Sequence, residues 1–411
     1  MVKLGISLEP KGSTMQRRLF TASCLSLVTC GALFAIRSAA ADELGVTLAA
    51  DKALVGAVLG MGFYGMGYVI AVASPLCDLL GMKTLLLLAC LLHVLGITGF
   101  LFAPGTTEDP SLDWARATML LVGLAHGLVE GVINPLIATL YPDEKTHKLN
   151  VLHAWWPGGI ILGGLLAYAM RSMGIGWQVT WGLALVPTVV YGIQVLGVTF
   201  PKTERTASGI SAGEMVKASL HPLFLLFVAM MAVTAATELG TGSWLDSVLS
   251  KTAGFGGVLL LVYGNALMFG LRFFAGPIAH KLSPIGLLTA SAALAALGLW
   301  LLSSASTTAS SIVATTAFFV GVCYFWPTML AVVSERFPKT GALGMGMLAA
   351  SGFLGSGFFT AKMGEVYQAE GAAAAFAFTT WLPIGLTVVF AAVWIGFTMR
   401  GGYRAERLGK S

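Results

Sequence analysis

The chain has 411 residues, of which 56% are hydrophobic and only 10% are Asp, Glu, Lys or Arg. Soluble domains contain about 25% charged residues, so a mean hydropathy of +0.83 excludes a large water-soluble domain and predicts an all-α polytopic protein of the lipid bilayer. The net charge is +5, but the basic residues stand singly or in pairs between apolar runs, unlike a nucleic-acid-binding stripe, so we expect no nucleic-acid partner.

Apolar windows of about 20 residues, the length that crosses the hydrocarbon layer, occur twelve times along the chain. They cover residues 19–41, 53–77, 84–103, 115–140, 150–170, 178–199, 221–249, 255–280, 285–303, 308–333, 340–368 and 374–399. The longest polar connector divides them six and six. We therefore predict 12 transmembrane helices in two pseudo-symmetric six-helix bundles, with an N-terminal tail 1–18, a first bundle 19–200, a linker 201–220, a second bundle 221–399 and a C-terminal tail 400–411.

The basic residues predict the orientation. With the N-terminus inside, cytoplasmic segments hold 17 of the 24 Lys and Arg residues and external loops hold 5. Positive charge marks cytoplasmic loops, so we expect both termini and the linker in the cytoplasm, in an inner or plasma membrane. The first window also resembles a cleavable signal peptide. We interpret it as a span, because its removal would leave eleven spans and break the division into two sixes.

Charged residues inside predicted spans are candidate functional groups, because a charge near the bilayer centre costs about 2.5–3.5 kcal/mol on insertion scales. Arg37 lies in the first span, and Asp42 joins it if that span is about 27 residues long. The two residues are separated by about 140° around a helix and so do not share a face.

The fourth span carries the strongest candidate. His126, Glu130 and Asn134 recur every four residues and form one polar stripe, while Gly123, Gly127 and Gly131 let another helix approach. Desolvation disfavours the charged form of a carboxyl group in such a place, which is the property that a proton carrier needs. The alternative is a permanently protonated Glu130 that makes a structural hydrogen bond.

The fifth span begins with His153 and Trp156, which are three residues apart and share a helix face. An aromatic plane beside a polar donor suits a sugar, whose C–H faces stack while its hydroxyls form hydrogen bonds. Spacing alone leaves open a second interpretation, in which His153 is a core histidine and Trp156 an interfacial anchor.

Polar residues in the second half suggest a cavity and a charge pair. Glu238 shares a face with threonines of the seventh span, whose glycines would loosen the helix; the alternative is a helix–helix contact held by hydroxyls. Asn265 and Arg272 lie two turns apart in the eighth span. For Arg272 we favour a pair with Glu335, at the end of the tenth span, over contact with a ligand.

The sequence lacks a Walker loop, a GxSxG elbow and an HExxH motif. Its five cysteines, all in apolar stretches, show no metal-type spacing, which indicates small core residues rather than disulfides or a zinc site; they are Cys24, Cys30, Cys77, Cys90 and Cys323. We therefore expect no enzyme, no catalytic residue, no bound metal and no cofactor.

Three stretches resemble a known family: Glu130 before Asn134-Pro135, the segment Tyr141-Pro142-Asp143-Glu144, and Leu149-Asn150 leading to His153. They are similar to the fucose–galactose–glucose:proton symporter branch of the major facilitator superfamily, whose two six-span repeats surround a central substrate site. The resemblance implies that Asp42 and Glu130 match the family's acidic pair and that His153 matches a sugar-contacting position.

We accordingly predict a secondary active transporter that moves a small polar solute, with a sugar as the favoured class, by proton symport and alternating access, as a monomer. Sodium coupling stays open. The second hypothesis is an exporter or organic-anion porter with Arg37 as counter-ion, and the third is a membrane-embedded enzyme or sensor. We expect Glu130 and Asp42 to carry protons, Arg272 and Glu335 to pair, and the substrate to contact His153, Trp156, Asn134, Glu238, Arg37 and Asn265.

Overall fold

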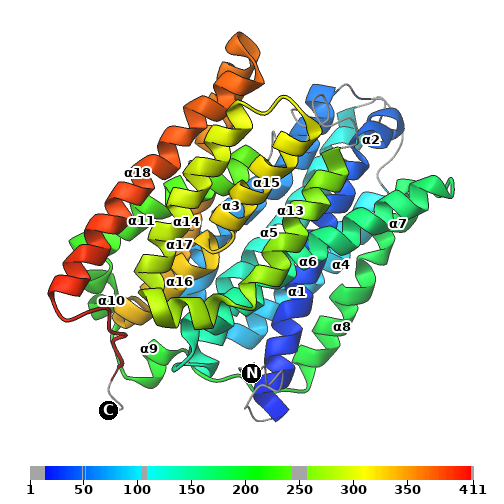
Figure 1. Ribbon diagram of the computed structural model, residues 1–411. Helices are drawn as coiled ribbons and strands as arrows, with labels where there is room; N and C mark the ends of the chain where they lie inside the picture. The colour runs from blue at the N-terminus through cyan, green and yellow to red at the C-terminus, as the bar shows by residue number, and fades with distance from the viewer. Residues whose placement is uncertain (1–13, 49, 51, 103–108, 243–256, 409–411) are drawn as a thin grey trace, which may run out of the picture.

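The computed structural model describes residues 14–48, 50, 52–102, 109–242 and 257–408, and within these ranges it consists of helices and short connections without a strand. The helices run side by side as one bundle (Figure 1). Those before the linker are α1 (Thr14–Ala39), α2 (Ala41–Thr47), α3 (Lys52–Leu79), α4 (Met82–Leu101), α5 (Asp109–Leu140), α6 (Lys145–Ser172), α7 (Trp177–Leu183) and α8 (Leu185–Leu196). We refer to α1–α8 as the first half.

Two short helices, α9 (Glu204–Ala207) and α10 (Ala212–Ala218), form the linker. The remaining helices are α11 (Pro222–Ala235), the π-helical turn η1 (Ala236–Gly240), α13 (Gly257–Arg272), α14 (Ala275–Ser303), α15 (Thr308–Val322), α16 (Phe325–Arg336), the 3₁₀ turn η2 (Pro338–Thr340), α17 (Gly341–Glu370) and α18 (Ala372–Met399). We refer to α11–α18 as the second half. The start of α1, the linker helices and the residues after α18 share one end of the bundle, the linker end (Figure 1).

The prediction of an all-α polytopic membrane protein is confirmed. Eleven stretches within the described residues are long and apolar enough to cross a membrane. The further expected span, 255–280, begins outside the described residues, is interrupted between α13 and α14, and continues as the first turns of α14. Those turns end at Ser283, whose φ of 65° breaks the helix, and Ser283 Oγ accepts from Gly286 N–H at 3.2 Å. Pro284 follows, directly before the next expected span, 285–303.

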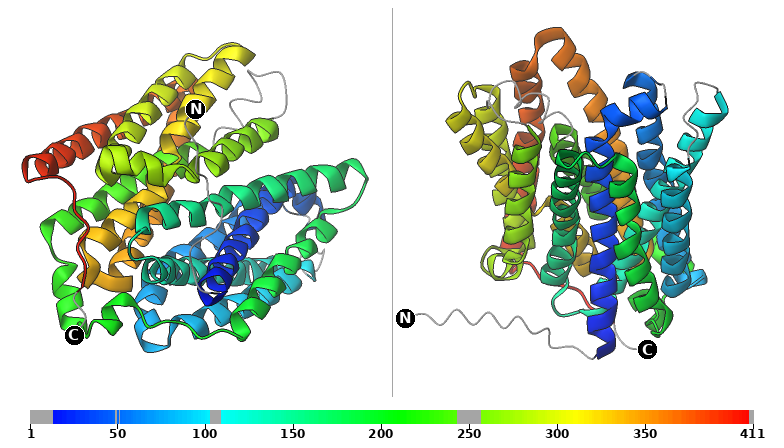
Figure 2. Two further views of the ribbon diagram at one scale, coloured as in Figure 1. Left: turned by 60° about the horizontal axis from the view of Figure 1, so that its bottom comes forward. Right: turned by 90° about the vertical axis from the view of Figure 1, so that its right-hand side faces the viewer.

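The two halves lie side by side (Figure 2, left). Within the first half, α3 packs on α5 and α1 on α6; within the second, α14 packs on α15 and α18, and α11 on α17. The principal helix pairs that join the halves are α3 with α17 and α6 with α13. Groups on α5, α6 and α13 are therefore close to the plane where the halves meet.

Glycines bring α3 and α5 into direct backbone contact. A Cβ atom at Gly123 would lie 2.2 Å from the carbonyl oxygen of Gly62, and one at Gly127 would lie 2.7 Å from that of Met66. The prediction that the glycines of the fourth span admit another helix is confirmed. The close contact between α3 and α5 also supplies a hydrogen bond that is missing within α5. Pro135 removes the usual donor to the carbonyl of Gly131, and Ser74 Oγ on α3 donates to that oxygen at 3.4 Å.

Hydrogen bonds join the two halves at the linker end. The Lys145 ammonium, at the start of α6, donates to the carbonyl of Ser334 at 3.0 Å. One oxygen of Glu335 accepts from the backbone N–H and the hydroxyl of Thr146, at 3.1 and 2.7 Å, and the other accepts from Tyr403 Oη at 2.7 Å. Burial and the adjacent Glu335 carboxylate raise the pKa of the Tyr403 phenol well above its ordinary value, so this hydroxyl is a donor at neutral pH.

The linker is bonded to the first half. Arg205 pairs with Asp78, at the end of α3, with its Nε 2.8 Å from Oδ2, and it also donates to the carbonyl of Ile210. Glu204 accepts from Lys145 Nζ at 2.6 Å. On the other side, the Arg205 side chain lies against Gly341, where a Cβ atom would be 3.1 Å from that of Arg205. Gly341 has a φ of 54°, which also favours glycine there.

Helices α14 and α15 offer a test of this close packing away from the interface of the halves. A Cβ atom at Gly298 would lie 2.3 Å from the backbone nitrogen of Phe318. We expect Gly298→Ala to destabilise the protein by about 1–3 kcal/mol, because overpacking must push the helices apart. The measurement is the melting temperature of the detergent-purified protein, followed by tryptophan fluorescence.

The matched control is Gly385→Ala on α18, where a Cβ atom would meet no atom within 4 Å. This exchange improves helix propensity by about 1 kcal/mol, so its melting temperature should stay equal or rise. Equal melting temperatures for both variants would contradict the packing argument.

Candidate functional site

A buried polar cluster joins α5 to α6. Asn134 Nδ2 donates to Glu130 Oε2 at 3.0 Å, and Asn134 Oδ1 lies 2.8 Å from His153 Nε2. Because the amide oxygen accepts, His153 carries its proton on Nε2. The Glu130 carboxyl also lies 3.9 Å from that nitrogen. All three side chains are 2–3% exposed, so Asn134 is the shared partner of a carboxyl group and an imidazole away from bulk water.

Arg272, the last residue of α13, connects this cluster to the second half. Its Nη1 donates to the backbone carbonyl of His153 at 2.6 Å, and its Nε donates to the carbonyl of Cys323 at 2.7 Å. Its Nη2 lies 3.4 Å from Glu238 Oε1. One guanidinium therefore holds α6 of the first half, the connection between α15 and α16, and the turn η1.

The predicted pair of Arg272 with Glu335 is wrong. Arg272 bonds Cys323, which precedes α16, whereas Glu335 lies at the far end of that helix, twelve residues and about 18 Å along its axis. Glu335 is instead satisfied at the linker end by Thr146 and Tyr403. The carboxylate that meets Arg272 is Glu238.

Glu238 occupies a π-helical turn at the end of α11. Such turns insert one residue into a helix and are frequent at functional sites. The Glu238 side chain keeps 13% of its area exposed, and its Oε2 has no hydrogen-bond partner among the described residues. The helix departs from α-helical winding at this turn, where the other carboxylate oxygen of Glu238 meets Arg272. Ser243 and Trp244, which follow in the expected span 221–249, lie outside the described residues.

Arg37 contacts a different part of the first half. Its guanidinium lies 4.9 Å from the ring centre of Phe34 and 4.4 Å from that of Phe63, and its Nη1 donates to the carbonyl of Leu59 at 3.3 Å. It is 6% exposed and forms no ion pair with a carboxylate whose side chain the structure describes. Gly62 makes room for it, since a Cβ atom there would lie 2.5 Å from Nη1.

Trp156 lies between Phe34, which contacts Arg37, and His126 of the polar stripe on α5. Its ring centre lies 6.2 Å from that of Phe34 and 6.3 Å from that of His126, and the side chain is partly exposed. The structure thus brings Glu130, Asn134, His153, Arg272 and Glu238 together along one chain of contacts. Trp156 contacts this stripe at His126, one turn before Glu130 on α5. Asn265 is buried on α13, two turns before Arg272.

Asp42 is placed differently from the expectation. It belongs to α2, a separate helix that follows the end of α1 at Ala39, and its side chain lies outside what the structure describes. The chain turns at Ala40, so the first span does not continue through Asp42.

Sequence analysis missed a second polar group in the first half. Cys30, His93 and His126 come from α1, α4 and α5, and their candidate ligand atoms all lie within 4.8 Å of one another. No spacing rule could connect them, because they belong to three separate helices. It also missed the bond from Arg272 to the His153 carbonyl. The available signal was Pro157, four residues after His153, which leaves that carbonyl without its usual helical donor.

Comparisons with known proteins agree with this architecture. A family model of the Major Facilitator Superfamily matches residues 19–360. A D-xylose transporter from Levilactobacillus brevis is 27% identical over 153 residues, which are 37% of this chain and 30% of that relative. The chain therefore aligns with less than a third of the relative's length.

Solved structures share the fold at low identity. The proton:xylose symporter XylE superposes with a TM-score of 0.76 and 16% identity, covering 97% of this chain and 98% of that one. The Escherichia coli fucose:proton symporter FucP gives 0.74 and 16%, covering 92% and 98%. The human organic anion transporter MFSD10 gives 0.73 and 14%, covering 93% and 100%.

The contacts of Arg272 give a prediction about stability. In Arg272→Lys the charge stays, but a single ammonium nitrogen on a flexible arm cannot reach all three acceptors. A buried acceptor left unpaired costs about 1–3 kcal/mol, so the melting temperature should fall.

The control is Arg116→Lys, an exposed residue whose Nη1 lies 3.0 Å from Asp113. Exposed pairs contribute about 0–1 kcal/mol, so this variant should melt like the wild type. If Arg272→Lys melts at the wild-type temperature as well, the three bonds of Arg272 do not hold the halves together.

Proposed function

Because this chain belongs to the major facilitator superfamily of membrane transporters, we propose that it imports a sugar together with protons by alternating access. The observation that carries the proposal is the buried Glu130–Asn134–His153 cluster, which Arg272 joins to the other half. In this superfamily the substrate site lies near the bilayer midplane between the two repeats. The relatives described as xylose and fucose transporters support the choice of a sugar.

Glu130 is the proposed proton carrier. Its side chain is 3% exposed, and its described partners are the Asn134 amide and the His153 imidazole rather than a lysine or arginine. Removal from water favours the neutral carboxylic acid, which would stay protonated while the site is closed. Entry of water on one side would then favour release of the proton. Asp42, whose side chain is not described, is the second proposed carrier, and sodium is the alternative coupling ion.

His153 and Trp156 are the proposed sugar contacts, with Asn134, Asn265 and Glu238 as further polar partners. Trp156 offers a partly exposed aromatic plane, and His153 lies three residues before it on α6. Stacking on an aromatic face combined with a few convergent polar groups fits a hydroxylated ring.

The bonds at the linker end define the proposed closed side of the transporter. Lys145 and Thr146 bond Ser334 and Glu335 across the halves. The excess of basic residues in the segments at this end supports a cytoplasmic location for it. Opening toward the cytoplasm then requires these bonds to break as the halves rock, which exposes the cluster to water on that side.

Arg37 favours a second candidate function, the transport of an organic anion. A buried guanidinium without a described carboxylate partner is a natural counter-ion for an anionic solute. The human organic anion transporter shares the same fold. The two candidates differ in the ligand that should stabilise the purified protein.

Glu130→Gln tests proton coupling. Glutamine mimics the protonated acid in shape but cannot release a proton. The variant should lose uphill accumulation of labelled sugar in proteoliposomes with an imposed pH difference. It should retain counterflow, since exchange needs only the loaded carrier to reorient. Glu365→Gln, an exposed carboxylate paired with Lys362 at 2.6 Å, is the control and should accumulate normally.

Accumulation by Glu130→Gln under the same pH difference would show that another group couples the proton. Accumulation by the wild type that follows an imposed sodium gradient, and not the pH gradient, would assign the coupling ion to sodium.

Trp156→Ala and His153→Ala test the solute. With D-xylose, L-fucose and D-glucose as probes, each variant should bind about tenfold more weakly than the wild type, which corresponds to about 1.4 kcal/mol. Thermal shift of the detergent-purified protein measures this, because a ligand stabilises the folded state by RT ln(1 + [L]/Kd). Trp381→Ala, 71% exposed on α18, is the control and should bind normally.

Unchanged affinity in both variants would assign His153 and Trp156 to the structural core. Stabilisation of the wild type by glucuronate and by no neutral sugar, lost in Arg37→Gln, would favour the organic-anion function instead.

A further inference from the structure

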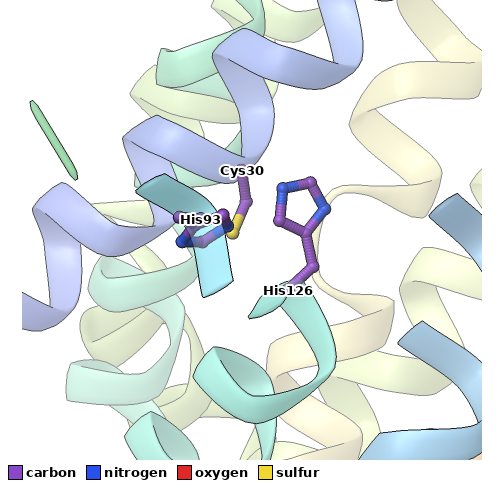
Figure 3. A group of neighbouring side chains, drawn as sticks. All are labelled: Cys30, His93 and His126. Atoms are coloured by element: carbon purple, nitrogen blue, oxygen red, sulfur yellow. The ribbon is translucent and has the colours of Figure 1, made fainter. Parts of the chain in front are cut away.

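Three ligand-type side chains converge inside the first half, apart from the Glu130 cluster. Cys30 on α1, His93 on α4 and His126 on α5 point toward one another (Figure 3). Their candidate ligand atoms lie within 4.8 Å of one another, and the side chains are 0–5% exposed. The ring centres of His93 and His126 are 5.0 Å apart.

The two imidazoles have unmet bonding capacity. His93 Nδ1 lies 2.9 Å from Tyr191 Oη, but His93 Nε2 and His126 Nε2 have no hydrogen-bond partner among the described residues. A buried polar atom without a partner costs about 1–3 kcal/mol. Two such nitrogens beside one thiol mark a place where a ligand would supply the missing interaction.

We propose that Cys30, His93 and His126 bind a thiophilic d¹⁰ cation, Zn²⁺ or Cu⁺. One sulfur and two imidazole nitrogens are donors that these ions prefer, whereas Mg²⁺ and Ca²⁺ require oxygen ligands. Zn–S and Zn–N bonds are about 2.3 and 2.0–2.1 Å long, so ligand atoms on one ion lie about 3.3–3.8 Å apart. Side-chain rotations that move the ligand atoms by about 1 Å would bring the three atoms to that spacing.

The surroundings fit coordination. Metal-bound histidines usually bond a neighbour through their other nitrogen, as His93 does with Tyr191. The Cys30 thiol loses its proton to solvent when the ion binds, and the imidazoles bind as neutral rings. Three protein ligands leave a fourth coordination position open.

Such an ion would cross-link α1, α4 and α5. It would also hold the His126 ring, whose centre is 6.3 Å from that of Trp156. The site thereby lies behind one wall of the proposed substrate site, but the inference does not depend on which solute that site takes.

Cobalt provides a direct test on the wild-type chain. The full-length protein, with any affinity tag removed, is dialysed against EDTA in detergent and titrated with Co²⁺. A thiolate-to-cobalt charge-transfer band is expected, because a sulfur ligand is part of the site. The absence of this band, together with no Zn²⁺ or Cu⁺ retained by the wild type, would overturn the proposal without reference to any variant.

Bound metal is then counted by mass spectrometry after incubation with Zn²⁺ or with Cu⁺ under reducing conditions, and the tighter ion names the occupant. We expect one ion per chain in the wild type and its loss in Cys30→Ser and in His126→Gln. Cys24→Ser, another buried cysteine of α1 that is not in the cluster, should keep the ion and the cobalt band.

Zn²⁺ should also raise the melting temperature of the wild type and of Cys24→Ser, but not that of the triple variant Cys30→Ser/His93→Gln/His126→Gln. If the triple variant binds as much metal as the wild type, binding belongs to other histidines and the proposed site is wrong. Equal loss in Cys24→Ser would contradict it as well.

Discussion

Polar groups surrounded by hydrocarbon must form their hydrogen bonds within the protein. Arg272 does so across the interface, and its bonds join the two halves. Its donors meet the carbonyls of His153 and Cys323 and the Glu238 carboxylate. Both carbonyls are free to accept, because Pro157 and Pro327 stand four residues after His153 and Cys323 and have no N–H to donate to them. Cys323 also lies where α15 gives way to α16. The same cation therefore balances a buried acid, caps a helix break and holds the interface.

Much of the fold could be predicted because hydropathy reports directly on membrane crossing. Eleven of the expected windows match membrane-length stretches of the described residues, whereas the window 255–280 is interrupted between α13 and α14. The internal breaks could not be predicted from hydropathy. The interruptions at Ala184 and Cys323 lie three and four residues before Pro187 and Pro327, a signal that a hydropathy window does not register. The turn η1 contains Glu238, which meets Arg272. At Cys323 and at η1 the break meets Arg272, a tertiary contact that a hydropathy window does not register.

The site was predictable where its members share a helix. Glu130 and Asn134 are one turn apart, and their bond follows from that spacing. The partner of Arg272 was predicted wrongly. The sequence alone does not distinguish Glu238 from Glu335, which differ in their position along the helix bundle: Glu238 lies beside Arg272, and Glu335 lies at the linker end. The group of Cys30 with His93 and His126 left no trace at all, since its three helices meet only after folding.

The hydrogen bonds of the linker reduce the length of free chain that connects the two halves. Arg205, Glu204 and the carbonyl of Ile210 are tied to α3, α6 and each other, so the chain up to Ile210 travels with the first half. Residues 211–221 then connect Ile210 to α11, and the seven residues of α10 among them span about 10 Å while they stay helical. The length of α10 therefore limits how far the two halves can separate at this end. Lengthening or unfolding α10 would change how far the transporter opens, with no change to any residue of the central site.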